Sequence, residues 1–410
     1  MRKYIIRTQT GKATEVQGRL SPLGIKPTGG AGDFIFVDIP EARVSEVQAL
    51  PGVVRVTPDQ RVGIAATMPV DAKVTEFSRL FKQPFGLPRA IAWSRAQDAG
   101  RQKIPTSLAA VAMGADRAWA LGIKGQGVKV CVLDTGMDIV CPQLPGIMAK
   151  SYVSGDPVGD DQNGHSTHVT TTIAGRQRGP LIGLASGVDI LPIKVLGYGI
   201  GMGNTSDILK GMQAAADWGA DVVSMSLGGE ASMPPEDDPM CIMIKEHTAR
   251  GTIYSVAAGN SGPKAQTIGS PGISPEAITV AAVDINGKIA DFSSRGPAYN
   301  QTKPDVAGIG VNLESSTTGL IGLMQFQDSM GDIPGKRGAI SGTSMATPCC
   351  SAVIALALGY ARERGKTLTA WQVKEAMASY GDFAGASKRT DYGWGLLTFP
   401  ILERYIDSVA

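Results

Sequence analysis

Residues 341–348, with the sequence SGTSMATP, contain the side chain best placed for nucleophilic chemistry, Ser344. An apolar run rich in alanine and leucine follows from Cys349 to Arg364, which predicts that a turn of small residues delivers Ser344 to the start of a long buried helix. Unpaired N–H groups at a helix N-terminus create a positive field that would stabilise an oxyanion formed beside the serine. Because serine and threonine are also the commonest helix caps, the octapeptide alone fits a plain cap equally well.

A base for this serine has to be sought among only three histidines. Two of them, His165 and His168, are three residues apart. A serine nucleophile needs a base to take its proton, and the base needs a carboxylate to fix its tautomer. One histidine of this pair, together with Asp134 and Ser344, can fill these roles. A metal site is the less favoured interpretation, because no His-Glu-x-x-His spacing occurs and no third ligand is apparent nearby apart from Asp160 and Asp161.

Hydrolysis of a peptide also requires donors for the oxyanion of the tetrahedral intermediate. Asn260, in the segment AAGNSG at 257–262, offers a side-chain amide directly after an apolar run. The alternative interpretation is an ordinary Asn-Ser-Gly turn.

The elements that must position these side chains are expected from about residue 114 onward. Continuously apolar runs alternate there with helical patterns of ten to fifteen residues, which is typical of an α/β fold with a mostly parallel sheet sandwiched by helices. The expected strands are 128–133, 190–196, 221–227, 252–258 and 277–283, and the expected helices are 166–174, 206–219 and 239–250. In such sheets the ligand crevice lies at the carboxyl ends of the strands. Asp134, Ser226 and Asn260 each follow a strand, so we expect them at one rim.

The first part of the chain has a pattern of its own. Residues 1–64 predict the order βαββαβ, a small α+β ferredoxin-like domain. We therefore divide the chain into a small domain at 1–66, a linker and N-terminal arm at 67–112, and an α/β domain at 113–410.

Composition narrows the class of protein further. The 410 residues are 43% hydrophobic and 19% charged, with a net charge of +2, so neither nucleic acid nor a membrane is an expected partner. The five cysteines match neither a disulfide framework nor zinc spacing. No apolar stretch near the N-terminus is long enough for a signal peptide, so we expect a cytoplasmic protein, or a secreted one if the numbering begins after a removed signal.

Four segments, in this order, resemble the active-site sequences of the subtilisin-like serine proteases: VLDTGMD at 132–138, NGHSTHV at 163–169, AAGN at 257–260 and GTSMATP at 342–348. The resemblance extends over about residues 114–400. It implies a serine endopeptidase in which Asp134 orients the base, His165 is the base and Ser344 is the nucleophile. It also implies that Asn260 and the Ser344 N–H form the oxyanion hole, and that His168 is a buried structural histidine.

The same resemblance implies a groove in which a peptide or protein substrate binds as an added β-strand. One side would be Ser226, Leu227 and Gly228, and the other the glycine-rich stretch around Gly199, Ile200 and Gly201. Gly269 matches the floor of the primary specificity pocket and implies a preference for a large apolar residue before the cut.

The small first domain resembles the propeptide of that family. This implies a zymogen whose own N-terminal domain acts as an intramolecular inhibitor and which cleaves itself somewhere in 64–80. The stretch 95–111 and an insertion at 317–338 depart from the family. We regard the insertion as either a lid over the groove or a tolerated surface loop.

Other departures fall beside the base and at a metal site. Ser166 and the segment 169–171 are bulkier than their counterparts in the family. Gln143 stands where the main calcium site has an aspartate, and arginines occur in the loop that would complete this site. We therefore expect no cofactor and no calcium at that position.

Three functions follow from these residues. The first is a self-processing endopeptidase, because all four catalytic roles are filled. The second is a dedicated protease or transpeptidase for one precursor peptide. The third is a pseudoprotease that only binds peptides, which would depend on the bulky residues beside His165.

Overall fold

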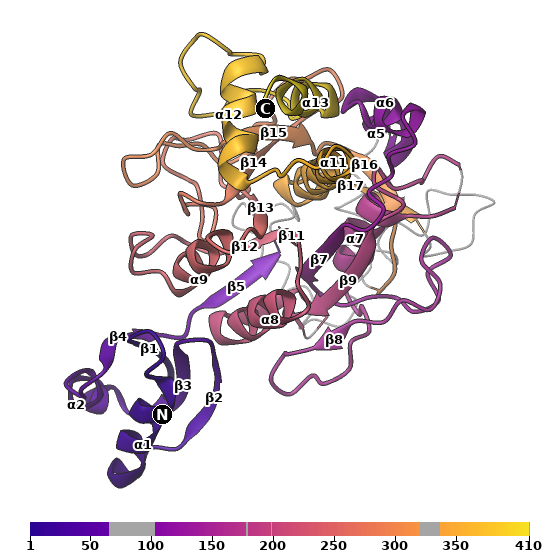
Figure 1. The fold of residues 1–410 in the computed structure, drawn as a ribbon. Helices are drawn as coiled ribbons and strands as arrows, with labels where there is room; N and C mark the ends of the chain where they lie inside the picture. Colours follow the sequence, from indigo (N-terminus) through magenta and orange to yellow (C-terminus); the bar gives the residue numbers. More distant parts are fainter. Residues whose placement is uncertain (65–102, 178, 198, 320–336, 410) are drawn as a thin grey trace.

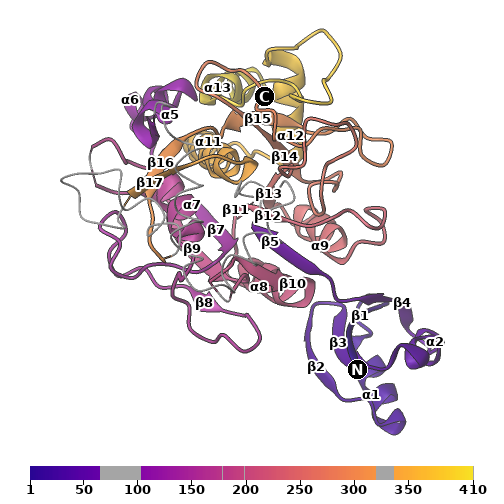
Figure 2. The same ribbon diagram turned by 180° about the vertical axis from the view of Figure 1, so that it is seen from behind.

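The computed structural model describes residues 1–64, 103–177, 179–197, 199–319 and 337–409, and Figure 1 shows their arrangement. The expected linker at 67–112 therefore lies mostly outside the described residues, and so do most of the expected cleavage region at 64–80 and most of the insertion at 317–338. A small N-terminal domain lies beside a much larger α/β body, and one strand runs from the former into the latter (Figures 1 and 2).

The N-terminal domain is a four-stranded antiparallel sheet covered by two helices. Its strands have the order β2-β3-β1-β4. The elements follow one another as the sequence predicts, although β2 starts later than expected and a 3₁₀ turn, Glu41–Arg43, precedes α2. They are β1 (Arg2–Thr8), α1 (Ala13–Leu20), β2 (Pro27–Ala31), β3 (Phe34–Ile39), α2 (Val44–Gln48) and β4 (Val53–Pro58). Ile6, Ile35 and Val37 lie on one face of this sheet and form its core against Val16 and Leu20.

The body is built on a seven-stranded sheet in which every pair is parallel, as the continuously apolar strands predict. The strand order is β15-β14-β13-β11-β7-β9-β8. The strands are β7 (Lys129–Asp134), β8 (Lys150–Ser151), β9 (Asp189–Lys194), β11 (Val222–Met225), β13 (Ile253–Ala257), β14 (Ile278–Val283) and β15 (Val306–Ile309). The adjacent strands β13, β11 and β7 bring their carboxyl ends to one edge.

Helices cover both faces of this sheet, so its central strands β7, β11, β13 and β14 are almost entirely buried (Figure 1). One layer contains α7 and α11 with the terminal helices, and the other contains α8 and α9. The helices are α5 (Thr106–Ala112), α6 (Ala115–Ala120), α7 (His165–Ala174), α8 (Thr205–Asp217), α9 (Pro239–Thr248), α11 (Thr343–Glu363), α12 (Ala370–Tyr380) and α13 (Phe399–Ser408). Among the described residues, α11 is the one helix long and apolar enough for a membrane span, and it is buried in the core.

Two small sheets complete the body. A hairpin of β16 (Leu313–Ser316) and β17 (Arg337–Ile340) pairs with β6 (Ile104–Pro105). Three short strands form the other sheet: β10 (Met202–Asn204), β5 (Arg61–Ile64) and β12 (Leu227–Gly228). The central strand of this second sheet, β5, comes from the end of the N-terminal domain.

Pro348 interrupts the hydrogen bonding of α11. It is not in the first turn but lies inside α11, where it cannot donate to the carbonyl of Ser344. The hydroxyl of Ser226 donates to this carbonyl instead, at 2.8 Å. The helix therefore continues past Pro348, and the bond ties the backbone of Ser344 to the end of β11.

Candidate active site

Asp134 and His165 come together at the edge where β7 ends and α7 begins. His165 Nδ1 lies 2.8 Å from Oδ1 and 2.9 Å from Oδ2 of Asp134, and both side chains are fully buried. A carboxylate at this distance fixes the tautomer that carries its proton on Nδ1, which leaves Nε2 to accept one. Within the described residues Nε2 has no hydrogen-bond partner.

Ser344 is the second residue of α11 and is also fully buried. Its Oγ donates to the carbonyl of Ser226 at 3.0 Å and not to His165. The structure thus brings the three predicted triad residues to one rim, with the acid–base pair formed and the serine hydroxyl bonded elsewhere. Catalytic hydrogen bonds are often unmade until substrate arrives.

Asn260 lies beside the first turn of α11. Its Oδ1 accepts from the backbone N–H of Thr343 at 2.9 Å and from Thr343 Oγ1 at 3.0 Å. These bonds fix the amide plane one residue away from Ser344. An amide held at this position can donate to an oxyanion that develops on the substrate carbonyl.

The predicted substrate-binding residues form the two walls of a groove that β5 occupies. Ile64 pairs with Leu227 and Gly63 pairs with Gly228, and both pairs are antiparallel. On the opposite wall, the carbonyl of Gly201 accepts from Ile64 N at 3.0 Å. A Cβ on Gly201 would come within 2.9 Å of the Ile64 side chain, so glycine allows the close approach.

The remaining predicted groove residues lie at its ends. The carbonyl of Gly199 accepts from Asn163 Nδ2 at 2.8 Å, and the Ile200 side chain is exposed. A Cβ on Gly269 would come within 2.6 Å of the carbonyl oxygen of Gly229, so backbone packing alone already demands glycine there.

Three residues near the base were not predicted to matter. Asp161 accepts from Thr135 Oγ1 at 2.8 Å, and Asn163 Oδ1 accepts from His165 N at 3.2 Å. The sequence shows two adjacent carboxylates, Asp160 and Asp161, but gives no sign of which one faces inward.

The bulky residues beside His165 are accommodated without displacing the Asp134 contact. Thr171 Oγ1 lies 2.8 Å from Ser315 Oγ, whereas the buried hydroxyls of Ser166 and Thr170 have no partner among the described residues. His168 bonds through Nε2 to the carbonyl of Leu313 at 3.0 Å. Burial lowers the pKa of His168 to about 3, so it stays neutral and structural.

No metal site is apparent in the part of the chain that the structure describes, because no three His, Cys, Asp or Glu side chains converge there. At the position of the family's calcium site, Gln143 Oε1 accepts from Gln177 N at 3.0 Å and its carbonyl from Arg176 N at 3.1 Å. Backbone N–H groups of the chain therefore already donate to both of these oxygens.

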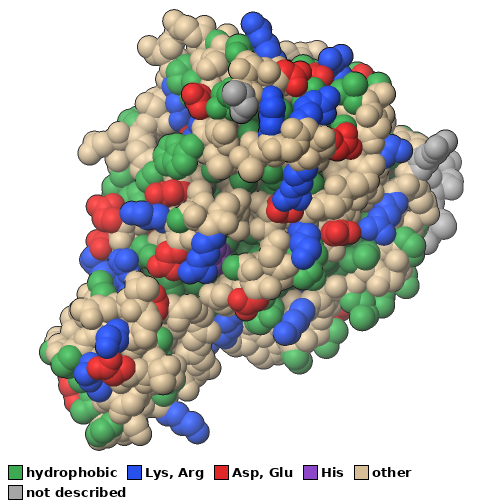
Figure 3. Space-filling model, in the orientation of Figure 1, with side chains coloured by type: hydrophobic (Ala, Val, Ile, Leu, Met, Phe, Trp, Pro, Cys, Tyr) green, Lys and Arg blue, Asp and Glu red, His purple; other side chains and the backbone are tan. Residues whose placement is uncertain are grey.

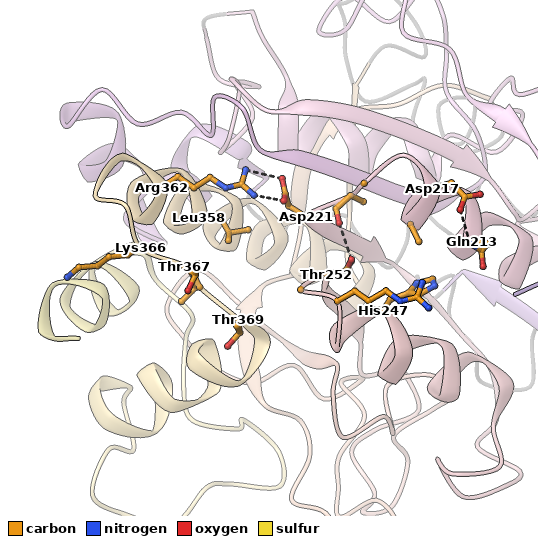
Figure 4. A pocket seen from close by; sticks show the side chains of 16 residues that line it. Gln213, Asp217, Asp221, His247, Thr252, Leu358, Arg362, Lys366, Thr367 and Thr369 are labelled. Carbon is orange, nitrogen blue, oxygen red and sulfur yellow. Dashed lines mark hydrogen bonds and ion pairs between the residues drawn. The ribbon is translucent and has the colours of Figure 1, made fainter. Parts of the chain in front are cut away.

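A separate cavity of about 570 Å³ opens at the opposite edge of the sheet (Figure 4). Asp221 and Thr252, which precede β11 and β13, line it, and Asp221 forms an ion pair with Arg362. Because it lies at the amino ends of these strands, this cavity is not part of the active-site groove.

Comparisons with known proteins agree with this geometry. Residues 125–395 match the subtilase family. The chain belongs to the subtilase family. It is 36% identical to serine protease AprX of Bacillus subtilis over 63% of this chain and 62% of AprX. It is also 34% identical to subtilisin DY of Bacillus licheniformis over 69% of this chain and 93% of that protein.

This subtilase is therefore a subtilisin-like serine endopeptidase with the α/β fold expected from its sequence. A third relative, the major intracellular serine protease of Bacillus subtilis, is 32% identical over 61% of the subtilase and 74% of the relative. The matched family region starts after α6, so it does not include the N-terminal domain.

Proposed function

We propose that this subtilase is made as a self-processing zymogen whose N-terminal domain first assists and then inhibits the catalytic body. The observation that carries the proposal is the position of β5, which is hydrogen-bonded on both sides in the groove expected to bind substrate. A strand held this way presents its following residue to Ser344 as a substrate would.

Asp134, His165 and Ser344 would perform the reaction as a catalytic triad. Ser344 Oγ attacks the substrate carbonyl carbon while its proton moves to His165 Nε2, and Asp134 stabilises the imidazolium that forms. The Ser344 N–H and the Asn260 amide donate to the oxyanion. The intermediate then loses the amine, which takes the proton from His165, and water hydrolyses the remaining acyl-enzyme by the same route.

The register of β5 predicts which bond is cut. Gly63 pairs with Gly228 and Ile64 with Leu227, so in a strand bound in this antiparallel register the next position lies opposite Ser226. The carbonyl of Ser226 accepts from Ser344 Oγ, so a peptide bond at that position would meet the nucleophile. We therefore expect cleavage between Ala65 and Ala66, inside the region that the resemblance implies.

We retain a preference for a large apolar residue before the cut in other substrates. A pocket with a glycine floor admits alanine, but a larger apolar side chain buries more area at about 25 cal/mol per Å². Profiling the cleavage of a mixed peptide library measures this preference, and broad cleavage after large apolar residues would argue against a dedicated processing enzyme.

Contacts between the N-terminal domain and the body support its role as inhibitor. Asp59 accepts from the backbone N–H of Ser206 at 3.0 Å and from its hydroxyl at 2.6 Å, at the start of α8. Arg55 forms an ion pair with Asp237, and Gln60 Nε2 donates to Ser232 Oγ at 2.6 Å. The domain thus binds on both sides of the groove that β5 enters.

We also propose that calcium does not occupy the position of Gln143, because its oxygens already accept hydrogen bonds from the chain. A chelator should then leave the melting temperature unchanged. If calcium instead raises the melting temperature of the wild type and Gln143→Ala abolishes this increase, calcium does bind at this position.

Intact mass of the purified wild type beside Ser344→Ala tests the proposal. The Ser344→Ala chain should keep its full 42.7 kDa, and the wild type should separate into residues 1–65 and the remainder. A wild type that reacts with a fluorophosphonate yet stays whole would refute self-processing alone. A folded wild type that neither reacts nor cleaves would refute the proposed triad as well.

A further inference from the structure

Asp161 is a buried carboxylate that the triad chemistry does not use. Its side chain lies next to the base, and the residue is 5% exposed. Within the described residues it has no lysine or arginine partner, yet a buried charge is costly unless it is paired or fully hydrogen-bonded. Five hydrogen bonds satisfy it, from Thr135 Oγ1, Asn163 N, Gly164 N, Thr167 N and Thr167 Oγ1.

These bonds join the two elements that provide the acid–base pair. The bond from Thr135 Oγ1, at 2.8 Å, comes from the turn directly after Asp134. The bonds from Thr167, at 2.8 Å from N and 2.7 Å from Oγ1, come from the first turn of α7, which starts at His165. One carboxylate therefore spans the end of β7 and the start of α7.

The two threonine hydroxyls extend this connection on both sides. Thr135 Oγ1 donates to Asp161 and accepts from Ser166 N at 3.0 Å. Thr167 Oγ1 donates to Asp161 and accepts from Asp138 N at 3.2 Å. The turn after β7 is thus fastened to α7 at two points, and the same carboxylate orients both hydroxyls.

We propose that Asp161 is a positioning residue which, through Thr135, holds the Asp134 turn and the His165 helix in the register that their contact requires. This inference rests on the proposed roles of Asp134 and His165. Both of those side chains are fully buried, and their atoms lie 2.8 Å apart, so a small displacement of either element would break the pair.

A simple helix cap is the competing explanation. A cap needs only the bonds from Gly164 and Thr167, which lie on α7 or just before it. The bond from Thr135 is different, because it reaches across to the strand-end turn and adds nothing to the cap. A metal ligand is a poorer explanation, since both carboxylate oxygens already accept hydrogen bonds.

The test compares Asp161→Asn with Asp160→Asn in the full chain. The two changes are isosteric and remove the same charge from neighbouring residues. The Asp160 carboxylate, however, is 53% exposed, and its ion pair with Lys194 is long at 3.7 Å. We expect Asp161→Asn to lower kcat about ten- to a hundredfold with little change in KM, because misplaced catalytic groups cost that much. Asp160→Asn should change neither.

Two substitutions of Thr135 distinguish a positioning role of Asp161 from a helix-capping role. Thr135→Val keeps the shape but removes the hydroxyl that bonds to Asp161 and Ser166, so it should lower the melting temperature and also lower kcat measured well below that temperature. Thr135→Ser keeps the hydroxyl and should restore kcat. This pair also provides the answer if Asp161→Asn does not fold.

The pH profile gives a further readout that a merely structural role would not move. Asp161 adds negative charge beside His165. The other charged or titratable groups around it are Asp134, which bonds to His165, the neutral His168, Asp138, whose N–H donates to Thr167, and Asp160, whose carboxylate lies 3.7 Å from Lys194 Nζ. Removing that charge should shift the acid limb of kcat/KM to lower pH. Equal kcat values for Asp161→Asn and Asp160→Asn, or for Thr135→Val and the wild type, would overturn the inference. An inactive wild type would instead refute the proposed function.

Discussion

At the scale of single residues, the site is half assembled. Asp134 and His165 are already in contact, whereas Ser344 Oγ donates to the Ser226 carbonyl. Within the described residues His165 Nε2 has no partner, and an unsatisfied buried nitrogen costs about 1–3 kcal/mol. A catalytic triad would require Ser344 Oγ to leave the Ser226 carbonyl and donate to this nitrogen.

Asn260→Ala tests the second residue-scale assignment. The substitution removes a donor to the oxyanion while leaving the groove walls intact, so kcat should fall about 10²–10³-fold with KM nearly unchanged. Steady-state kinetics on one peptide substrate measures both constants. Because Asn260 also accepts from Thr343, the melting temperature serves as the control. A loss in KM alone would assign Asn260 to substrate binding.

Thr170→Val tests the departures beside the base. Among the described residues the buried Thr170 hydroxyl has no partner, so an apolar isostere should stabilise the protein by about 1 kcal/mol. Thr171→Val is the matched control, since the Thr171 hydroxyl bonds to Ser315 and to the Thr167 carbonyl and its loss should destabilise. Denaturant unfolding of both variants in the Ser344→Ala background gives the comparison. Equal effects would indicate that an internal water satisfies Thr170.

At the scale of elements, the sequence was informative wherever periodicity was strong. The apolar runs predicted β7, β11 and β13, and since parallel neighbours end at one edge, they also predicted that Asp134, Ser226 and Asn260 would meet. Periodicity could not predict the sheet of β10, β5 and β12, because its strands have two to four residues and contain glycine, and only the family resemblance implied a strand between these walls. Asp161 was missed for a different reason: hydrogen bonds within a turn leave no periodic signal.

Asp305→Asn is the prediction at this scale. Asp305, one residue before β15, bonds to Lys303 at 2.7 Å and to Lys388 at 2.7 Å, and Lys374 is 3.7 Å away. Burial alone would raise the pKa of Asp305, but the three lysines outweigh it and lower it. Removing the carboxylate charge leaves buried amines unpaired, so the variant should lose about 3–5 kcal/mol.

The pH dependence of that loss follows from Lys303. Burial lowers the pKa of Lys303 to about 7, even beside Asp305. A lysine whose pKa is lower in the folded than in the unfolded state contributes stability that is lost as pH falls toward the folded value. The Asp305→Asn loss should therefore be larger at pH 6 than at pH 9 in thermal unfolding. Asp391→Asn, which breaks an exposed pair with Arg389, should cost only about 0–1 kcal/mol.

At the scale of the whole molecule, the N-terminal domain docks by burying one face of its sheet. Ile5, Phe34 and Phe36 join the apolar cluster of α8 and α9 that includes Met212 and Met243. The face of the molecule in Figure 3 has positive and negative side chains interspersed, in keeping with the small net charge. Apolar burial and the paired strand β5, and not a large electrostatic field, therefore hold the two parts together.

Asp59 determines how this docking should respond to acid. Burial in the interface raises the pKa of Asp59, the neighbouring Asp207 adds to this, and the hydrogen bonds from Ser206 only partly oppose it. A carboxyl whose pKa is raised on docking binds its proton more tightly in the docked state. The contribution of Asp59 to docking is therefore complete below its ordinary pKa and is lost as pH rises through the raised value.

Acid alone should consequently not release the N-terminal domain through Asp59. The test compares the melting temperatures of the Ser344→Ala chain with and without Asp59→Asn. As the pH falls from 7 to about 4, the chain that keeps Asp59 should gain stability relative to the Asp59→Asn chain, because only the carboxyl takes up a proton. Gln60→Ala removes a non-ionisable contact of the same interface, so its effect should be the same at both pH values. If acid favours Asp59→Asn instead, Asp59 is an acid-sensitive release switch.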